Sequence, residues 1–316
     1  MTSVASVYRA ERLRQVQAYL ETQANRPQAL LVAAIFISVL LWASSFPAIQ
    51  VSLTAYTPAE VAFLRYLVAS AMLGGYAIVS RMPMPRPRDL PLISICGFLG
   101  FTVYNFMLNV GQLTVSAGIA SFIISSEVGA MAILSQLFFK ERLSKTGWIG
   151  VFLCTFGIAI ISLTDGGSIQ LSMGAVFVFG ATLAASLYSV LQKPLLERYT
   201  AVQFTTYAAF AGTICLFFFA PRAVFSVLGA PLYPTLSVVY MGLFPGVVAY
   251  VAWSYVLSKL PTAQAGSYLA LVPVAALLIA WIWLREIPTP ISLIGGAIVF
   301  FGVMLINQID RKAVTL

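Results

Sequence analysis

Histidine is absent from this sequence, and charged residues are scarce. Of the 316 residues none is His and 9% are Asp, Glu, Lys or Arg, whereas an ordinary soluble domain carries roughly 25% charged residues. The chain is therefore not expected to be a soluble globular domain. The missing imidazole also removes the commonest metal ligand and the one side chain that titrates near neutral pH without help, so we expect no metal site and no cofactor.

Cysteine is equally scarce. The three cysteines, Cys96, Cys154 and Cys215, each lie inside a long apolar run rather than in a loop, which is not the pattern of a disulfide-stabilised secreted domain. We expect them to act as small apolar packing residues.

Apolar length is what the sequence has in abundance. Hydrophobic residues make up 60% of it, and a bilayer core about 30 Å thick is crossed by about 20 apolar residues in a helix. The strands of a membrane barrel would instead alternate apolar and polar residues. The pattern predicts an all-α polytopic membrane protein with ten transmembrane helices. We number them as spans one to ten, and their predicted ranges are 29–53, 59–80, 91–111, 117–139, 146–163, 172–192, 203–220, 236–257, 263–284 and 290–308.

Lysine and arginine are distributed unevenly between the segments that connect the spans. Fifteen of the eighteen lie in the N-terminal arm, the C-terminal tail and alternate connections, against Arg222 and Arg285 in the other connections and Arg65 inside span two. Cytoplasmic segments of membrane proteins are enriched in these residues, which places both termini in the cytoplasm. Topology thereby explains the net charge of +8, and we expect no nucleic-acid partner.

The chain contains an internal repeat. When it is shifted by 145 residues against itself, FFKERLSKTGWIGVFLCTFGIAII lies over WLREIPTPISLIGGAIVFFGVMLI without a gap. The shift pairs Glu141 with Glu286 and Gly157 with Gly302. We infer a duplication of five spans.

A repeat with an odd number of spans must begin its second copy on the opposite side of the membrane, so the two copies are inverted. Inverted repeats place a binding site near the bilayer midplane, and rocking of the halves exposes it alternately to the two sides. This architecture indicates a transporter. The predicted boundaries of the cytoplasmic arm, the first repeat, the second repeat and the cytoplasmic tail are 1–28, 29–163, 164–308 and 309–316.

Several short motifs resemble those of one family. LLWASSFPAI in span one, Arg65-Tyr66 in span two, and the FFKERL and WLRE ends of spans four and nine are similar to the corresponding segments of the drug/metabolite transporter superfamily, EamA type. The resemblance implies a secondary transporter with a central cavity lined mainly by spans one, three, four, six, eight and nine. It is greatest to bacterial exporters of aromatic and other amino acids, which implies a multi-pass protein of the bacterial inner membrane surrounded by lipid.

One position departs from the family's pattern. The resemblance implies a proline part-way along span four, as Pro273 provides in span nine, but the corresponding residue is Val128, preceded by Glu127. If that proline acts as a hinge in both repeats, the first repeat lacks it.

Two ionisable residues lie well inside spans, Glu127 near the centre of span four and Arg65 in span two. Such residues are costly in the bilayer and should face protein or water. Glu127 either binds a substrate amine or a coupling proton, or is a packing residue bonded by Gln112 or Asn109. For Arg65 we favour pairing with Glu60 or a helix end over binding of a substrate carboxylate.

Polar and aromatic residues mark further candidate positions. The shift of 145 places Asn105 on Tyr250 and Asn109 on Ser254, and residues four apart share a helix face. Such stripes either line a polar substrate pathway or hold helices together. The residues that we predict to bind substrate are Trp42, Ser44, Tyr104, Asn105, Asn109, Glu127, Tyr188, Tyr250, Trp253, Ser254, Ser267 and Tyr268.

Spans five and ten carry glycines instead. Gly150 and Gly157 lie in span five, and Gly295, Gly296 and Gly302 in span ten. Small residues allow close helix approach, which predicts that these two spans are scaffold rather than cavity. They are also candidates for a contact between subunits, so the chain is a monomer or a homodimer.

The function that follows is secondary-active transport of small polar or amphipathic metabolites or drugs, amino acids among them, with export by alternating access as the expected mode. An enzyme is not expected, because acid, base and nucleophile machinery is lacking. The alternative is a nucleotide-sugar or phosphate-ester antiporter. Such a protein needs several cavity cations to neutralise phosphate, and Arg65 is the single intramembrane candidate.

Overall fold

The structure is a computed structural model that describes residues 4–115, 117–140, 143–164, 173–284 and 290–308. Every secondary-structure element in these ranges is helical. The nine elements of the first half are α1 (Val4–Leu53), α2 (Pro58–Val79), η1 (Pro87–Asp89), α3 (Leu90–Gly97), η2 (Phe98–Val103), α4 (Tyr104–Gly111), α5 (Ala117–Ser125), α6 (Glu127–Phe139) and α7 (Lys145–Thr164).

The second half begins at α8 and repeats this order of long helices. Its elements are α8 (Met173–Leu191), α9 (Lys193–Leu196), α10 (Ala201–Leu216), η3 (Phe217–Phe219), α11 (Ala220–Gly229), α12 (Leu232–Leu243), η4 (Phe244–Ala249), α13 (Tyr250–Lys259), α14 (Thr262–Ser267), η5 (Tyr268–Ala270), α15 (Leu271–Leu284) and α16 (Pro290–Gln308).

Each predicted span coincides with one helical element or a run of consecutive elements. Most boundaries differ by a few residues, but the segment of span seven, predicted to end at 220, continues to Gly229, and α1 begins at Val4. Spans one and two, predicted at 29–53 and 59–80, correspond to the apolar segments Gln28–Leu53 and Pro58–Val79. Seven segments of the described chain are long and apolar enough to cross a membrane, and Leu293–Ile306 is a shorter apolar helix. The all-α polytopic fold class is confirmed.

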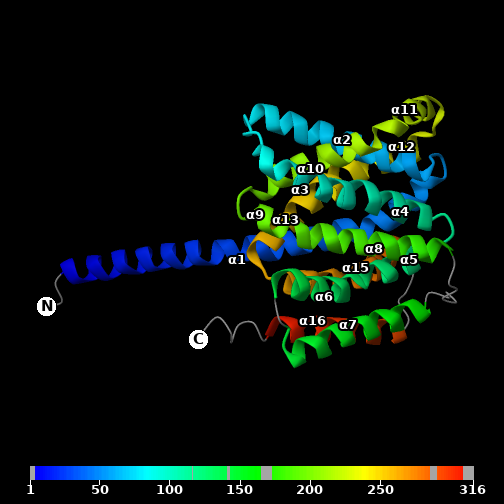
Figure 1. Ribbon diagram of the computed structural model, residues 1–316. Coiled ribbons are helices and arrows are strands. Elements are labelled where there is room, and N and C mark those ends of the chain that lie inside the picture. Colours follow the sequence, from blue (N-terminus) through cyan, green and yellow to red (C-terminus); the bar gives the residue numbers. More distant parts are fainter. Residues whose placement is uncertain (1–3, 116, 141–142, 165–172, 285–289, 309–316) are drawn as a thin grey trace.

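The helices form two lobes with spans one and six between them (Figure 1). In the first lobe α2 packs on α10 and α12, and α10 packs on α3 and α13, which joins spans two, three, seven and eight. In the second lobe α7 packs on α16, and α6 packs on α14 and α7, which joins spans four, five, nine and ten. Each lobe therefore takes two spans from each repeat. α1 contacts spans four, eight and nine, and α8 contacts spans three and four.

Helices α7 and α16 lie side by side at the edge of the second lobe (Figure 1). A Cβ atom on Gly150 would lie 2.7 Å from the Gly302 carbonyl oxygen, and one on Gly157 would lie 2.7 Å from the Gly295 carbonyl oxygen. The helices are thus antiparallel and in backbone contact, as the glycines of spans five and ten predict.

Spans three and eight are each interrupted by a π-helical segment, η2 and η4, at corresponding places in the two repeats. In η4, Pro245 has no N–H group, so the regular ladder of backbone hydrogen bonds cannot continue. Span three has no proline there. Instead, the Asn105 side-chain amide donates to the carbonyl oxygens of Gly100 and Phe101, each at 3.2 Å, and so satisfies backbone acceptors that cannot meet water.

Spans four and nine are also interrupted at corresponding places, α5–α6 at Ser126 and α14–α15 at η5. Span four is therefore broken although Val128 replaces the proline implied by the family resemblance. The Ser125 hydroxyl donates to the Ser121 carbonyl at 2.8 Å, and the Ser126 hydroxyl donates to the Ile123 carbonyl at 2.6 Å. Such bonds compete with backbone pairing and bend helices.

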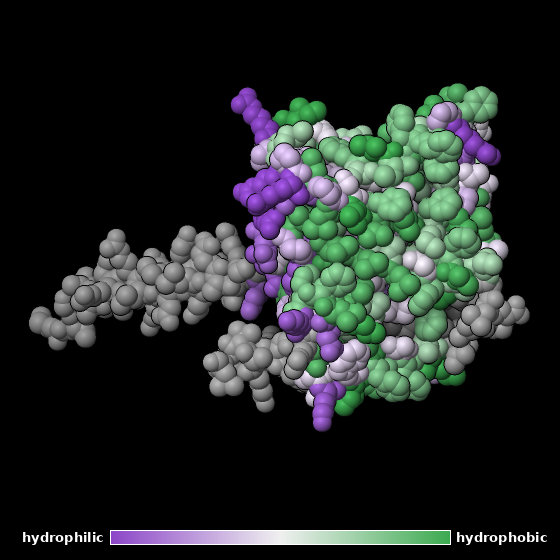
Figure 2. Space-filling model, in the orientation of Figure 1, coloured by the Kyte–Doolittle hydropathy of each residue, from purple (hydrophilic) through white to green (hydrophobic). Residues whose placement is uncertain are grey.

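An apolar surface covers the middle of the molecule. Hydrophilic residues gather at the end where α1 enters the bundle, with a smaller group at the opposite end (Figure 2). α1 enters the bundle on the same side as that on which α16 ends (Figure 1). Residues 4–28 are helical and continue into span one as part of α1, and the predicted division between arm and span at residue 28 stays a prediction. The side of the membrane, the repeat boundaries at 163 and 164, and the tail stay predictions.

Candidate functional site

A cavity lies between the lobes, and its atom-free volume is about 530 Å³ when the space that is open to the surroundings is included. It is lined by residues of spans one, three, four, six, eight and nine, the six spans implied by the family resemblance. The lining residues are Trp42, Phe46, Gly100, Tyr104, Ile124, Ser125, Glu127, Ala185, Tyr188, Ser189, Tyr250, Trp253, Leu269 and Val272.

Half of the predicted binding residues meet in this cavity. They are Trp42, Tyr104, Glu127, Tyr188, Tyr250 and Trp253. The other half lie outside its lining, and these are Ser44, Asn105, Asn109, Ser254, Ser267 and Tyr268. Their side chains belong to helix–helix or intrahelical contacts, which is the alternative open to polar groups in a membrane.

The four residues of the polar stripes on spans three and eight divide between the cavity lining and contacts with neighbouring helices. Asn105 is fully buried and donates to the Tyr66 hydroxyl at 2.8 Å, and Asn109 donates to the Pro58 carbonyl at 3.0 Å. Ser254 donates to the Gln192 side-chain oxygen at 3.0 Å. Of the four stripe residues only Tyr250 lines the cavity. A 145-residue shift finds equivalent helix positions but does not show which neighbour faces them.

The three remaining residues are held by neighbouring backbone and side chains. The Ser44 hydroxyl donates to the Leu41 carbonyl at 2.8 Å and lies 2.6 Å from the Tyr240 hydroxyl. Ser267 donates to the Gln264 carbonyl at 2.7 Å. Tyr268 packs partly buried against the apolar core.

Aromatic rings form one wall of the cavity. Trp42 of span one stands edge-on to Tyr250 and Trp253 of span eight, with ring centroids 5.4 and 5.5 Å apart. Tyr188 of span six contacts Tyr250 at 5.8 Å. Edge-to-face pairs of this kind add to the stability that area burial provides, so the wall is held in place by its own packing.

The cavity lining also carries the carboxyl group of Glu127. This residue is 6% exposed and is the first residue of α6. The Ser189 hydroxyl donates to it at 3.4 Å, and the Trp253 indole N–H donates to the Ser189 oxygen at 3.2 Å. The carboxyl group is thus connected to the aromatic wall through one serine.

Two predicted partners of the intramembrane charges were wrong. Glu127 is bonded by Ser189 rather than by Gln112 or Asn109. Glu60 does not pair with Arg65, because its carboxylate caps α2 at Thr57 and meets Arg222. Arg65 is 2% exposed, and its guanidinium lies 5.5 Å from the Tyr66 ring centroid.

Eight lining residues were not predicted. They are Phe46, Gly100, Ile124, Ser125, Ala185, Ser189, Leu269 and Val272. The repeat itself held a signal for some of them, because the 145-residue shift carries Ile124 to Leu269 and Glu127 to Val272, and all four line the cavity. Gly100 is required by close packing, since a Cβ atom there would lie 2.5 Å from the Tyr188 ring.

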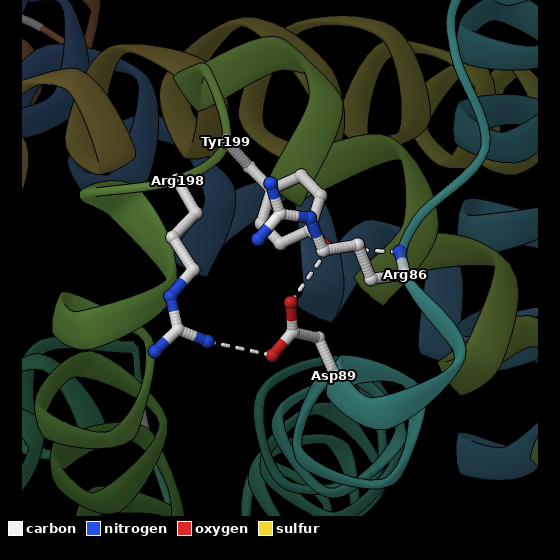
Figure 3. Close-up of polar contacts among 4 residues, drawn as sticks. All are labelled: Arg86, Asp89, Arg198 and Tyr199. Carbon is white, nitrogen blue, oxygen red and sulfur yellow. Dashed lines mark hydrogen bonds and ion pairs between the residues drawn. The ribbon is translucent and has the colours of Figure 1, made fainter.

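A network of polar contacts among four residues lies at one end of the first lobe, and Figure 3 shows these contacts. The Tyr199 hydroxyl donates to Asp89 at 2.8 Å and accepts from the Arg86 backbone N–H at 3.0 Å. Arg198 donates to the other carboxylate oxygen of Asp89 at 2.7 Å. This network, which we call the Asp89 tie, joins the connection before span three to the connection before span seven.

A second tie lies at the other end of the same lobe. Arg222 on α11 is 3.2 Å from the Glu60 carboxylate, and the Ser226 hydroxyl donates to it at 2.9 Å. The Glu60 tie joins the start of span two to the connection after span seven. Spans two and seven are equivalent in the two repeats. Each tie joins the start of one of these spans to the connection that follows the other, so the two ties occupy equivalent places.

Among the described residues of spans five and ten, none is in the cavity lining, as predicted for a scaffold. Of the repeated K/R-E motif, Glu141, Arg285 and Glu286 lie outside the described residues.

Comparison with known proteins gives a consistent result. The model of the EamA-like transporter family matches residues 29–163 and 172–308. The chain is 38% identical over 277 residues to a protein named a probable terminal-alkyne amino-acid exporter in Streptantibioticus cattleyicolor, covering 88% of this chain and 93% of that protein. It is 36% identical over 279 residues to the uncharacterized transporter YdfC of Bacillus subtilis, covering 87% of this chain and 91% of that protein.

The fold also matches a solved crystal structure. The TM-score is 0.70 at 18% sequence identity, and the match covers 90% of this chain and 98% of the other. Two matched segments of one family model, arranged as two five-span repeats around a cavity, together establish the relationship. The chain belongs to the EamA-like transporter family and is a polytopic membrane transporter.

Proposed function

We propose that this transporter is a secondary-active exporter of small polar or amphipathic metabolites or drugs, amino acids and their analogues among them. The observation that carries the proposal is the cavity between the lobes, which combines a buried carboxyl group with an aromatic wall. The name of the Streptantibioticus relative, an amino-acid exporter, supports the same class. A flux driven by an ion gradient or by exchange agrees with the sequence, which contains no G-x-x-x-x-G-K-[ST] loop for ATP.

Alternating access is the mechanism that this architecture supports. Inverted repeats give two related conformations in which one pathway or the other is closed. The cavity residues come from both lobes, so a change in the angle between the lobes would widen one entrance and narrow the other. The Asp89 and Glu60 ties keep the first lobe together during that movement.

The proposed binding residues are the six predicted residues that line the cavity. Glu127 is the functional centre, as a site for a substrate amine or a coupling proton, because its burial and its position at the start of α6 fit a group whose charge changes during the cycle. Trp42, Tyr250 and Trp253 offer ring surfaces for the apolar part of a solute.

The phosphate-ester alternative finds no support in the lining. A nucleotide-sugar or phosphate-ester antiporter needs cations to pair with phosphate, and no Lys or Arg is among the described lining residues.

We also propose that the protein lies in the bacterial inner membrane, with both termini cytoplasmic and the repeats at 29–163 and 164–308.

Counterflow in proteoliposomes tests the proposal. Purified full-length protein should exchange labelled phenylalanine or leucine against the unlabelled amino acid and not against nucleotide sugars. The same vesicles with and without a pH gradient report proton coupling. Exchange of nucleotide sugars without exchange of amino acids or amines would reject the proposed class, with protein-free vesicles as the control.

A further inference from the structure

We propose that the cavity selects cationic amines with an aromatic or bulky apolar body and discriminates against the free carboxylate of zwitterionic amino acids. Amino-acid amides, esters and decarboxylated amines are the chemical class that it takes in preference. The amine lies at Glu127 and the apolar body lies against Trp42, Tyr250 and Trp253. The inference rests on the proposed function and names its substrate class more closely.

The described cavity lining contains an acidic side chain and no basic one. Of the described lining residues Glu127 is the one carboxylic acid, and none is Lys or Arg. Arg65 is buried but lies outside the lining, over the Tyr66 ring. An ammonium group therefore finds a carboxylate among these residues, whereas a substrate carboxylate finds no cation among them. A charge taken from water without a partner is strongly disfavoured.

Several of the hydrogen-bond donors in the lining already have acceptors. The Trp253 indole N–H donates to Ser189, the Tyr250 hydroxyl donates to the Gly100 carbonyl at 3.0 Å, and the Ser125 hydroxyl donates to Ser121. Two of these bonds lock the aromatic wall, so that Tyr250 and Trp253 offer ring surfaces rather than N–H or O–H groups. Ring faces attract cations through their quadrupole and do not attract carboxylates.

The two repeats differ at one pair of equivalent lining residues. The shift of 145 residues carries Glu127 to Val272, and both line the cavity. The equivalent pair Ile124 and Leu269 is apolar on both sides. The carboxyl group is therefore present on span four and replaced by an isopropyl group on span nine. This asymmetry gives the solute one orientation, with its amine toward span four.

A matched ligand series tests the selectivity without any mutation. Binding of phenethylamine, phenylalaninamide, phenylalanine and 3-phenylpropionate to the purified full-length protein is measured by ligand-dependent thermal stabilisation and by tryptophan fluorescence. The two carboxyl-free amines should bind about 10- to 100-fold more tightly than phenylalanine, and 3-phenylpropionate should bind most weakly. Equal or tighter binding of phenylalanine would overturn the inference.

Two variants locate the selectivity at Glu127. Glu127→Gln should remove the preference for the amines, whereas the exchange Glu127→Val with Val272→Glu should restore it, because the carboxyl group returns at the equivalent position. Glu60→Gln is the matched control, since it removes another buried carboxylate that lies outside the cavity, and it should leave the preference unchanged. An unchanged preference in a folded Glu127→Gln protein contradicts the assignment.

The outcomes separate this inference from the proposed function. Amino-acid counterflow together with tighter binding of phenylalanine rejects the selectivity and leaves an amino-acid exporter. Nucleotide-sugar counterflow with no binding in the amine series rejects both.

Discussion

The Cys154 thiol lies 3.7 Å from the carbonyl oxygen of Val299, and the two residues are 145 positions apart, which is the repeat shift. A residue meets its own equivalent only where it lies next to the axis that relates the two copies. Gly150 meets Gly302 and Gly157 meets Gly295 on either side of this point, as a two-fold axis between antiparallel helices requires. The pseudo-axis of the inverted repeat therefore passes between α7 and α16 near Cys154.

Adding methyl groups at this axis should destabilise the fold. Gly150→Ala and Gly302→Ala each place a Cβ atom within 2.8 Å of a backbone oxygen, and backbone cannot move aside easily. Each should lower the free energy of unfolding by about 1–3 kcal/mol, and by similar amounts, because the two sites share one contact. Thermal unfolding in detergent micelles measures this.

Gly75→Ala is the matched control for these variants, because a Cβ atom there meets nothing within 4 Å. It should cause no loss of stability. If Gly150→Ala is as stable as Gly75→Ala, the close α7–α16 contact is not needed for the fold.

Cysteine labelling should distinguish cavity residues from buried packing residues. In a protein with Cys96, Cys154 and Cys215 replaced by alanine, a cysteine at Ser189 or Val272 should react with a small water-soluble thiol reagent. Added substrate should slow that reaction, because both positions line the cavity.

A cysteine at Ser254, which is fully buried and bonded to Gln192, should stay unreactive in the same protein. Rapid labelling of Ser254→Cys together with protection of Val272→Cys would reverse the assignment of the cavity face. Mass spectrometry of the intact protein quantifies the labelled fraction.

The two partners in the Asp89 tie should contribute unequally to stability. The Arg198 side chain is 47% exposed, so Arg198→Ala should cost less than about 1 kcal/mol. Asp89→Ala should cost about 1–3 kcal/mol, because Asp89 is buried and its loss leaves both Tyr199 and Arg198 without their acceptor.

Unfolding of the two single variants and of the double variant gives the coupling between Asp89 and Arg198. A larger loss for Arg198→Ala than for Asp89→Ala would mean that the exposed charge, rather than the buried acceptor, stabilises the connection. Tyr199→Phe separates the contribution of the hydroxyl bond.

The position of the termini remains a prediction from charge, and a reporter fusion tests it. A reporter that is active only in the cytoplasm, fused after residue 316, should be active, because fifteen Lys and Arg residues lie on that side against two on the other. The same reporter fused near Gly229, in the connection between spans seven and eight, should be inactive although the protein inserts normally. A reversed pattern would invert the topology and with it the proposed direction of export.

The sequence by itself determined the class, the spans and the repeat. Apolar runs of about 20 residues can satisfy their backbone in lipid only as helices, so most span ranges could be predicted to within a few residues. The shift of 145 residues also indicated two equivalent halves before any packing was known. The family resemblance implied which six spans surround the cavity.

The tertiary structure decided which side chains face that cavity. Asn105 and Tyr250 occupy almost the same place in their repeats, yet Asn105 turns to Tyr66 and its own helix backbone while Tyr250 lines the cavity. A polar group in a membrane takes whichever partner lies within hydrogen-bond reach, and that partner comes from a helix far away in the sequence. Helix periodicity gives the face of a residue on its own helix, and only the packing of neighbouring helices determines what that face meets.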